Sequence, residues 1–185
     1  MRAALSRFRK AQDGLAAVEF GFLLPVMLTF FFGLVEVSLA LSCRADVDNV
    51  AATAADLTAQ ASNISTNDMN NVFSAASAIM YPNDTSVGTI TVTSVIYDTT
   101  SKSLTSGKVD WSCTKYGTAR GNGSTVSLPA GLMTANGSVI MSEVTYNYTS
   151  PTSRIITGPL RMTHTFYTKP RRVSKITGPT ASNCP

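Results

Sequence analysis

Residues 15–41 read LAAVEFGFLLPVMLTFFFGLVEVSLAL, and this stretch decides the architecture because only Glu19 and Glu36 carry charge in it. As an α-helix it would measure about 40 Å, which exceeds the roughly 30 Å hydrocarbon core of a bilayer. Four basic residues precede it, at Arg2, Arg7, Arg9 and Lys10. Positive charge at this end favours a cytoplasmic N-terminus and an exported remainder. We expect a single-pass membrane protein, because no second apolar stretch of comparable length follows.

Composition and charge narrow the function classes. The chain has 185 residues, of which 44% are hydrophobic and 14% charged. This composition suits one folded domain with an appendage and excludes the class of disordered tail proteins. A single histidine, His164, excludes histidine-rich metal sites. The net charge of +4 divides into a basic leader, an acidic middle and a basic tail after Glu143, unlike a uniformly basic nucleic-acid binder. We expect no cofactor, no metal and no nucleic-acid partner.

A cleaved secretory signal is an alternative interpretation of the same N-terminus. Residues 38–40 read Ser-Leu-Ala, which could serve as a small-residue cleavage site. The apolar run is well beyond the usual length of about 7–15 residues, and Glu19 near its start has no use in such a signal. Cleavage after Ala40 would release a periplasmic binding domain.

The residues around Glu19 form a processing motif. Residues 14–20 read GLAAVEF: a glycine, four residues, then Glu and an aromatic, behind a basic leader. This pattern resembles the prepilin-peptidase site of type IV-type pilins, and its Glu-Phe ending, at Phe20, most resembles the Flp/Tad branch. The resemblance implies cleavage between Gly14 and Leu15. It also implies that the Glu19 carboxylate, fifth in the mature chain, pairs with the new N-terminal amine of a subunit.

A longer string that includes Pro25, Gly33 and Glu36 looks like the TadE-like pseudopilins over about residues 10–50. A short major Flp pilin ends soon after its helix, whereas this chain continues for more than a hundred residues. The resemblance implies a non-enzymatic minor pilin that takes part in assembling a Flp/Tad-type pilus. Pro25 would bend the helix or free a carbonyl for subunit contacts, unless it is simply a proline that a membrane helix tolerates.

The resemblance also implies partners and a location. The expected partners are the inner membrane, a prepilin peptidase, other Tad pilins and pseudopilins, and the Tad inner-membrane platform. The C-terminal part would be periplasmic, or extracellular if the protein is incorporated into the pilus. An uncleaved single-pass Tad assembly protein that stays in the inner membrane is the alternative.

The remaining pattern predicts an α+β fold, in which the long N-terminal helix extends into a pilin-like domain with a second helix and an antiparallel sheet. Apolar residues in steps of three and four, from Val47 through Leu57 to Ile64, predict that the first helix continues over 42–64. Residues 65–68 offer N-caps for the second helix, which must end by Tyr81 because Pro82 follows.

The sheet is expected in the last part of the chain. Alternating residues predict strands near 88–97, 107–114, 138–149 and 158–168, with a weaker one near 124–128. Short connections favour antiparallel pairing. The expected organisation is therefore a leader (1–14), a transmembrane helix (15–41), its continuation (42–64) and an exported domain (65–185).

The polar candidates outside the motif mostly suggest structural roles. His164 lies on the apolar face of its strand pattern, which indicates a satisfied core or edge histidine rather than a catalytic base, and no nucleophile-elbow motif accompanies it. We expect no enzymatic activity. The basic tail at 169–175 indicates a solvated edge, with a seat for anionic lipid or an acidic neighbour as alternatives.

Three cysteines allow one disulfide. Cys113 and Cys184 fall in the exported part, where disulfides persist, and tail-locking disulfides also occur in type IV pilins. Their pairing would close a loop of about 70 residues and contribute roughly 4 kcal/mol. Cys43, at the membrane exit, would be left over. Three unpaired buried thiols are the alternative.

Overall fold

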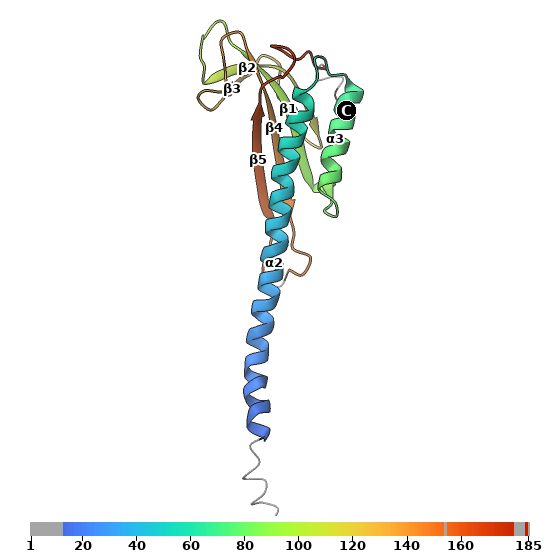
Figure 1. Ribbon diagram of the computed structural model, residues 1–185, viewed down its shortest axis with the longest axis vertical. Helices are drawn as coiled ribbons and strands as arrows, with labels where there is room; N and C mark the ends of the chain where they lie inside the picture. Colours follow the sequence, from blue (N-terminus) through green and yellow to red (C-terminus); the bar gives the residue numbers. More distant parts are fainter. Residues whose placement is uncertain (1–12, 154, 180–183, 185) are drawn as a thin grey trace, which may run out of the picture.

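One long helix runs through the molecule, and a sheet with a second helix packs against its C-terminal half (Figure 1). The computed structural model describes residues 13–153, 155–179 and 184. Helix α2 spans Asp13–Ala59, and its 47 residues measure about 70 Å. Its N-terminal half extends beyond all the other elements in Figure 1. We call residues 14–39 of α2 the stalk and the packed remainder the head.

The stalk and the head part of α2 differ in what covers their side chains. Large apolar side chains of the stalk are exposed, including Phe22 at 78% and Phe30 at 70%. From Ala40 onward, one face of the helix is buried against the sheet and the second helix. Among the described residues, α2 alone is long and apolar enough to cross a membrane. An apolar surface this large is suited to lipid or to other helices.

Helix α2 ends at Ala59, so the expected continuation to residue 64 was too long. The chain turns away because Ile64 pairs with the C-terminal segment, its backbone N–H donating to the Thr177 carbonyl at 2.9 Å. Leu57, expected on the buried stripe, is 38% exposed because it borders a hollow beside the sheet edge.

The second helix, α3, spans Thr66–Ile79 and begins and ends where the sequence predicts. Ser65 is its N-cap and forms a reciprocal capping box with Asp68. These hydrogen bonds, from the Ser65 side chain first and its backbone second, lower the pKa of Asp68. Met69, Val72, Phe73 and Ala76 are buried on one face.

A five-stranded antiparallel sheet completes the head, in the order β3-β2-β1-β4-β5. A 3-10 turn, η1 (Thr85–Val87), precedes the first strand. The strands are β1 (Gly88–Tyr97), β2 (Ser106–Lys115), β3 (Thr125–Ser127), β4 (Ser138–Tyr148) and β5 (Leu160–Thr168). The expected α+β fold and antiparallel sheet are therefore confirmed.

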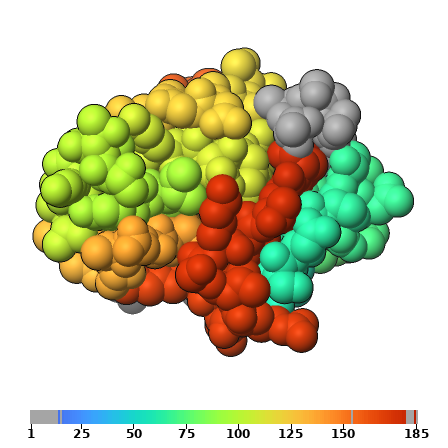
Figure 2. All heavy atoms as spheres, turned by 90° about the horizontal axis from the view of Figure 1, so that it is seen from above, coloured from blue at the N-terminus to red at the C-terminus, as the bar shows by residue number. Residues whose placement is uncertain are grey.

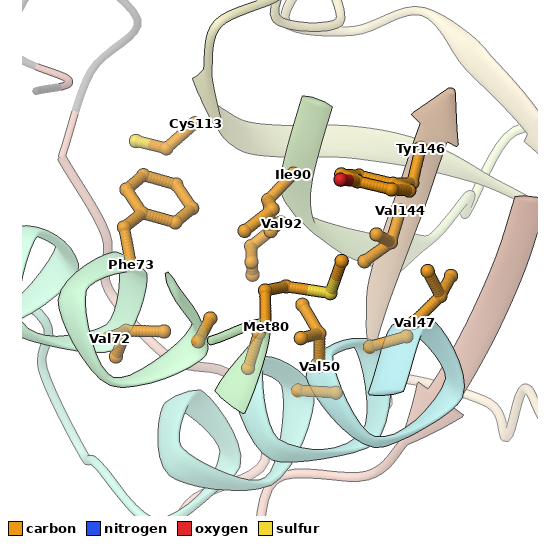
Figure 3. Packing of buried hydrophobic residues seen from close by; sticks show 14 of the residues in the cluster. Val47, Val50, Val72, Phe73, Met80, Ile90, Val92, Cys113, Val144 and Tyr146 are labelled. Carbon is orange, nitrogen blue, oxygen red and sulfur yellow. The ribbon is translucent and has the colours of Figure 1, made fainter. Parts of the chain in front are cut away.

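The main core lies between one face of the sheet and the two helices. In Figure 3, Phe73 of α3 points toward Cys113 of β2, and Val47 and Val50 of α2 face Val144 and Met80. A smaller cluster of valines, leucine and methionines occupies the other sheet face, under the loops.

The C-terminal segment crosses the end of the head. In Figure 2 it runs between the loops of the sheet and the turn that joins α2 to α3. The Trp111 indole Nε1 donates to the Ile176 carbonyl at 2.9 Å. Gly178 lies so close to the indole that a Cβ there would be 2.2 Å from Trp111 Cε2, so only glycine fits.

Candidate functional site

The expected processing residues lie at the free end of the stalk. Gly14 and Leu15 fall in the first turn of α2, and no atom lies within 4 Å of a Cβ built on Gly14. Glu19 and Phe20 are exposed one turn later, and Glu19 forms no ion pair with a described residue. The basic leader residues lie outside the described part of the chain. The scissile bond expected from the motif is thus far from the head.

Pro25 sits inside α2, which continues through it without interruption. The ring removes the N–H that the carbonyl of Gly21 would otherwise accept. The Thr29 hydroxyl donates to the Pro25 carbonyl at 2.8 Å. The stalk therefore has one exposed backbone carbonyl, that of Gly21, without its usual helical N–H donor.

The buried polar site of the molecule is Glu36, at the junction of stalk and head. Its side chain is fully buried, at 0% exposure, although it lies among the apolar residues of the stalk. The backbone N–H groups of Ile155 and Ile156 donate to Glu36 Oε2 at 3.0 and 2.7 Å. The Thr152 hydroxyl donates to Oε1. Hydrogen bonds to a buried carboxyl group offset the cost of its burial.

All three donors come from the loop that joins β4 to β5, residues 149–159. We call it the clasp, because it reaches down from the sheet and holds α2. Gly33, one turn before Glu36, makes room for it: a Cβ on Gly33 would lie 3.0 Å from Ile155 Cδ1. Ser150 and Ser153 brace the clasp internally, with Ser153 Oγ donating to the Ser150 carbonyl at 2.7 Å.

Two hollows flank the clasp along α2. One, of about 270 Å³, lies between Ile155 and the stalk residues Leu28, Thr29 and Phe32. The other, of about 330 Å³, lies on the head side, and we call it the exit groove. One wall of the exit groove is Val37, Ala40, Leu41 and Arg44 of α2, and the other is Ile156, Leu160, Arg161 and Met162.

His164 meets α2 just beyond the exit groove. Its Nδ1 lies 2.9 Å from Asp48 Oδ1, and Arg44 Nε lies 3.4 Å from the same oxygen. The histidine is half-buried on the edge strand, facing the helix. The histidine lies on the edge strand, as the strand pattern predicts, but the buried Asp48 Oδ1 that it approaches has no hydrogen-bond partner among the described residues.

The structure brings Cys113 and Cys184 together in a disulfide, with Cα atoms 5.4 Å apart. The bond joins the C-terminal segment to β2. Cys43 carries a free thiol that is buried in the main core at 1% exposure.

The basic tail is not simply a solvated edge. Arg171 forms an ion pair with Asp56 of α2, and Lys175 Nζ lies 2.7 Å from Asp110 Oδ1. The Arg171 backbone N–H also donates to the Ala59 carbonyl at 2.9 Å. Two of the tail cations therefore fix the C-terminal segment to the head.

Sequence reasoning missed Glu36 as a site residue. It noted the charge but assigned it no role, because its partners lie 116 to 120 positions further along the chain. The available signal was the pair of Gly33 and Glu36, a glycine and an acid one turn apart in an apolar helix. A glycine inside a helix costs about 1 kcal/mol relative to alanine, so it can mark a close packing partner, as Gly33 does, although Gly21 of the same helix has none among the described residues.

The exposed apolar stalk is long and apolar enough to cross a membrane, which fits a helix-anchored membrane protein. Comparison with known families shows what this helix is similar to. The model of the TadE-like protein family matches residues 14–56. The match begins at the glycine of the processing motif and ends within the last turns of α2, leaving the sheet uncovered. The resemblance seen in the sequence is confirmed, and it associates the protein with the Tad pilus machinery. No curated protein and no solved structure matches the chain.

Proposed function

We propose that the protein is a minor pilin of a Flp/Tad-type pilus, a non-enzymatic pseudopilin that enters the membrane through the stalk. The observation that carries the proposal is that the family match and the exposed apolar stalk lie on the same helix, α2. The family match covers the stalk and most of the packed part of α2. The large apolar side chains of the stalk are exposed. Such a helix can lie in lipid and later pack against other pilin helices.

The proposed orientation has the leader in the cytoplasm and the head in the periplasm. The basic leader favours this orientation. The disulfide that fixes the C-terminal segment fits an oxidising compartment. The head would remain outside the membrane throughout assembly, whether or not the protein is finally built into the pilus.

A prepilin peptidase would remove the leader between Gly14 and Leu15. The bond lies at the free end of the stalk, so its cleavage would leave every head contact in place. A conventional signal-peptidase cut after Ala40 would instead divide α2 within the head and remove Glu36, the residue that holds the clasp. This contrast favours a membrane-anchored pilin over a secreted binding domain.

Assembly would use the exposed half of α2. Glu19 would pair with the N-terminal amine of a neighbouring subunit, which neutralises two charges in an apolar helix bundle. Pro25 would contribute indirectly, because it leaves the Gly21 carbonyl, one turn earlier, free for contacts with another subunit. Other Tad pilins, pseudopilins and the inner-membrane platform are the proposed partners.

Intact-mass measurement of the membrane-extracted protein tests the proposal. Wild type should lack residues 1–14, and Gly14→Val should retain them, because a side chain there obstructs the approach of the peptidase to the backbone. Gly21→Val is the matched control, since Gly21 is another exposed stalk glycine with open space around it. A mature chain that begins at Leu41 would overturn the proposal, and an unprocessed wild type would favour the uncleaved assembly protein.

A further inference from the structure

The exit groove lies where an apolar surface gives way to positive charge. Ala40 and Leu41 line it on α2, and Leu160 lies on the opposite wall. Leu41 is 65% exposed and Leu160 45% exposed, so the apolar lining is open to the surroundings. Its only charged lining residues among those described are Arg44 and Arg161.

The two arginines leave a net positive charge at the groove. Arg44 shares the carboxylate of Asp48 with His164. Arg161 is exposed and forms no ion pair with any residue that the structure describes. A guanidinium presents a planar fork that matches the oxygens of a phosphate.

The groove also has the right depth for a lipid. The exposed apolar residues of α2 run from Val18 to Leu41, which as a helix spans about 36 Å against a hydrocarbon core of roughly 30 Å. The groove therefore straddles the outward boundary of the core. Its apolar lining would lie at acyl-chain depth, and Arg44, one turn beyond Ala40, would lie at headgroup depth.

We propose that the exit groove binds an anionic phospholipid of the outward-facing leaflet. An acyl chain lies between Ala40 and Leu160, and the phosphate lies against Arg44 and Arg161. A volume of about 330 Å³ is at the small end of ligand pockets, which suits a segment of one acyl chain and not a whole helix. This inference rests on the proposed membrane insertion of the stalk.

The charge of the lining favours lipid over a second protein. A neighbouring apolar helix placed in the groove would bury Arg44 and Arg161 without supplying an acid, which is costly. A phosphate supplies the opposite charge and leaves the arginines partly solvated. The bound lipid would thereby fix the height of the head above the membrane.

Native mass spectrometry of the full chain in detergent micelles tests the inference. Phosphatidylglycerol and phosphatidylcholine with identical acyl chains are the probes. We expect phosphatidylglycerol to bind more tightly, by about fivefold for each arginine at the headgroup level. The double variant Arg44→Gln, Arg161→Gln should abolish the preference, and Lys169→Gln with Arg172→Gln, which removes two tail cations outside the groove, should preserve it.

A second variant separates binding of lipid in the groove from a general effect of positive charge. Leu41→Trp, at a groove residue that is 65% exposed, fills the groove while leaving both arginines, and it should lower retention of both lipids. Val18→Trp, on the exposed stalk, is the control for an added indole. Melting of each variant in the same micelles verifies that the head is folded, and Leu41→Phe replaces Leu41→Trp if it is not.

Two outcomes would overturn the inference. Equal retention of the two lipids that is insensitive to both arginines would exclude a phosphate seat. A dimer that dissociates in Leu41→Trp would show that a second copy occupies the groove. Neither outcome affects the proposed function, which fails separately if alkaline carbonate releases the wild-type chain from membranes.

Discussion

Glu36 and Glu19 are two carboxylates on one helix with opposite surroundings. Glu36 is buried and accepts hydrogen bonds from groups of the clasp that include the Thr152 hydroxyl and the backbone N–H groups of Ile155 and Ile156. Glu19 is exposed at the far end of the stalk, about 25 Å away along the helix. Glu36 therefore fixes the clasp to α2, whereas Glu19 is available to a partner subunit.

Glu36→Gln should loosen the clasp without unfolding the head. Glutamine keeps one accepting oxygen but brings an NH2 group where a second acceptor is needed, so one buried donor of the clasp loses its partner. That loss costs about 1–3 kcal/mol. Trypsin cleavage after Arg154, the one tryptic site within residues 149–159, should become roughly tenfold faster. Gly33→Ala should loosen the clasp less, since Ile155 Cδ1 can shift by a few tenths of an ångström. Unchanged cleavage in Glu36→Gln would mean that the carboxylate does not hold the clasp.

Glu19→Gln should leave the clasp intact and disrupt assembly. The peptidase reads mainly the glycine and the apolar run, so the variant should be processed and remain in the membrane. An amine left unpaired in an apolar bundle should cost about 3–5 kcal/mol, enough to stop incorporation. Co-purification with the other pilins measures the effect, with the trypsin assay as the control for folding. Normal pili from this variant would show that assembly does not use the carboxylate.

The two carboxylates also show which residues a sequence can reveal. The role expected of Glu19 comes from neighbours within five positions, so the motif is visible in the sequence alone. The role of Glu36 depends on a loop more than a hundred positions away, so no local pattern carries it. The same holds for Gly178 of the C-terminal segment, whose neighbour Trp111 is on β2, 67 positions earlier in the chain.

At the scale of elements, local patterns predicted most boundaries correctly. The strands begin and end within two residues of expectation, because alternation and turn residues are local signals. The end of α2 was wrong because a tertiary contact, the pairing of Ile64 with Thr177, competes with helix continuation. The clasp, without regular structure of its own, left no periodic signal.

Gly178→Ala should displace the C-terminal segment from the sheet. The new methyl group would overlap the Trp111 ring, so the hydrogen bond from the indole to Ile176 should break and the indole should become more exposed. Trp111 is the only tryptophan, so its fluorescence reports on this site alone, and its emission should shift to longer wavelength. Gly158→Ala is the matched control because a Cβ there meets open space. An unshifted spectrum in Gly178→Ala would show that the segment adapts without leaving the ring.

At the scale of the whole molecule, the proposed orientation places the stalk and the head in different solvents. Exposed apolar residues and a basic leader belong to the N-terminal end, and the disulfide belongs to the other end. The clasp and the exit groove lie at the transition between the two. The Glu36 carboxyl group allows the irregular clasp to lie beside the apolar stalk, because it accepts hydrogen bonds from backbone N–H groups of the clasp.

The orientation of the whole chain can be tested through its own disulfide. Replacing Arg2, Arg7, Arg9 and Lys10 with Gln removes the positive charge that favours a cytoplasmic N-terminus, while the basic residues beyond the stalk remain. Part of the population should then keep its head in the cytoplasm, where Cys113 and Cys184 stay reduced. Differential alkylation of acid-quenched cells should detect these thiols, whereas wild type should show only the free thiol of Cys43. Replacing Lys169 and Arg172 with Gln is the control and should leave the disulfide formed. A fully oxidised pair after loss of all four leader charges would mean that the leader does not set the orientation, and that the stalk and head do so themselves.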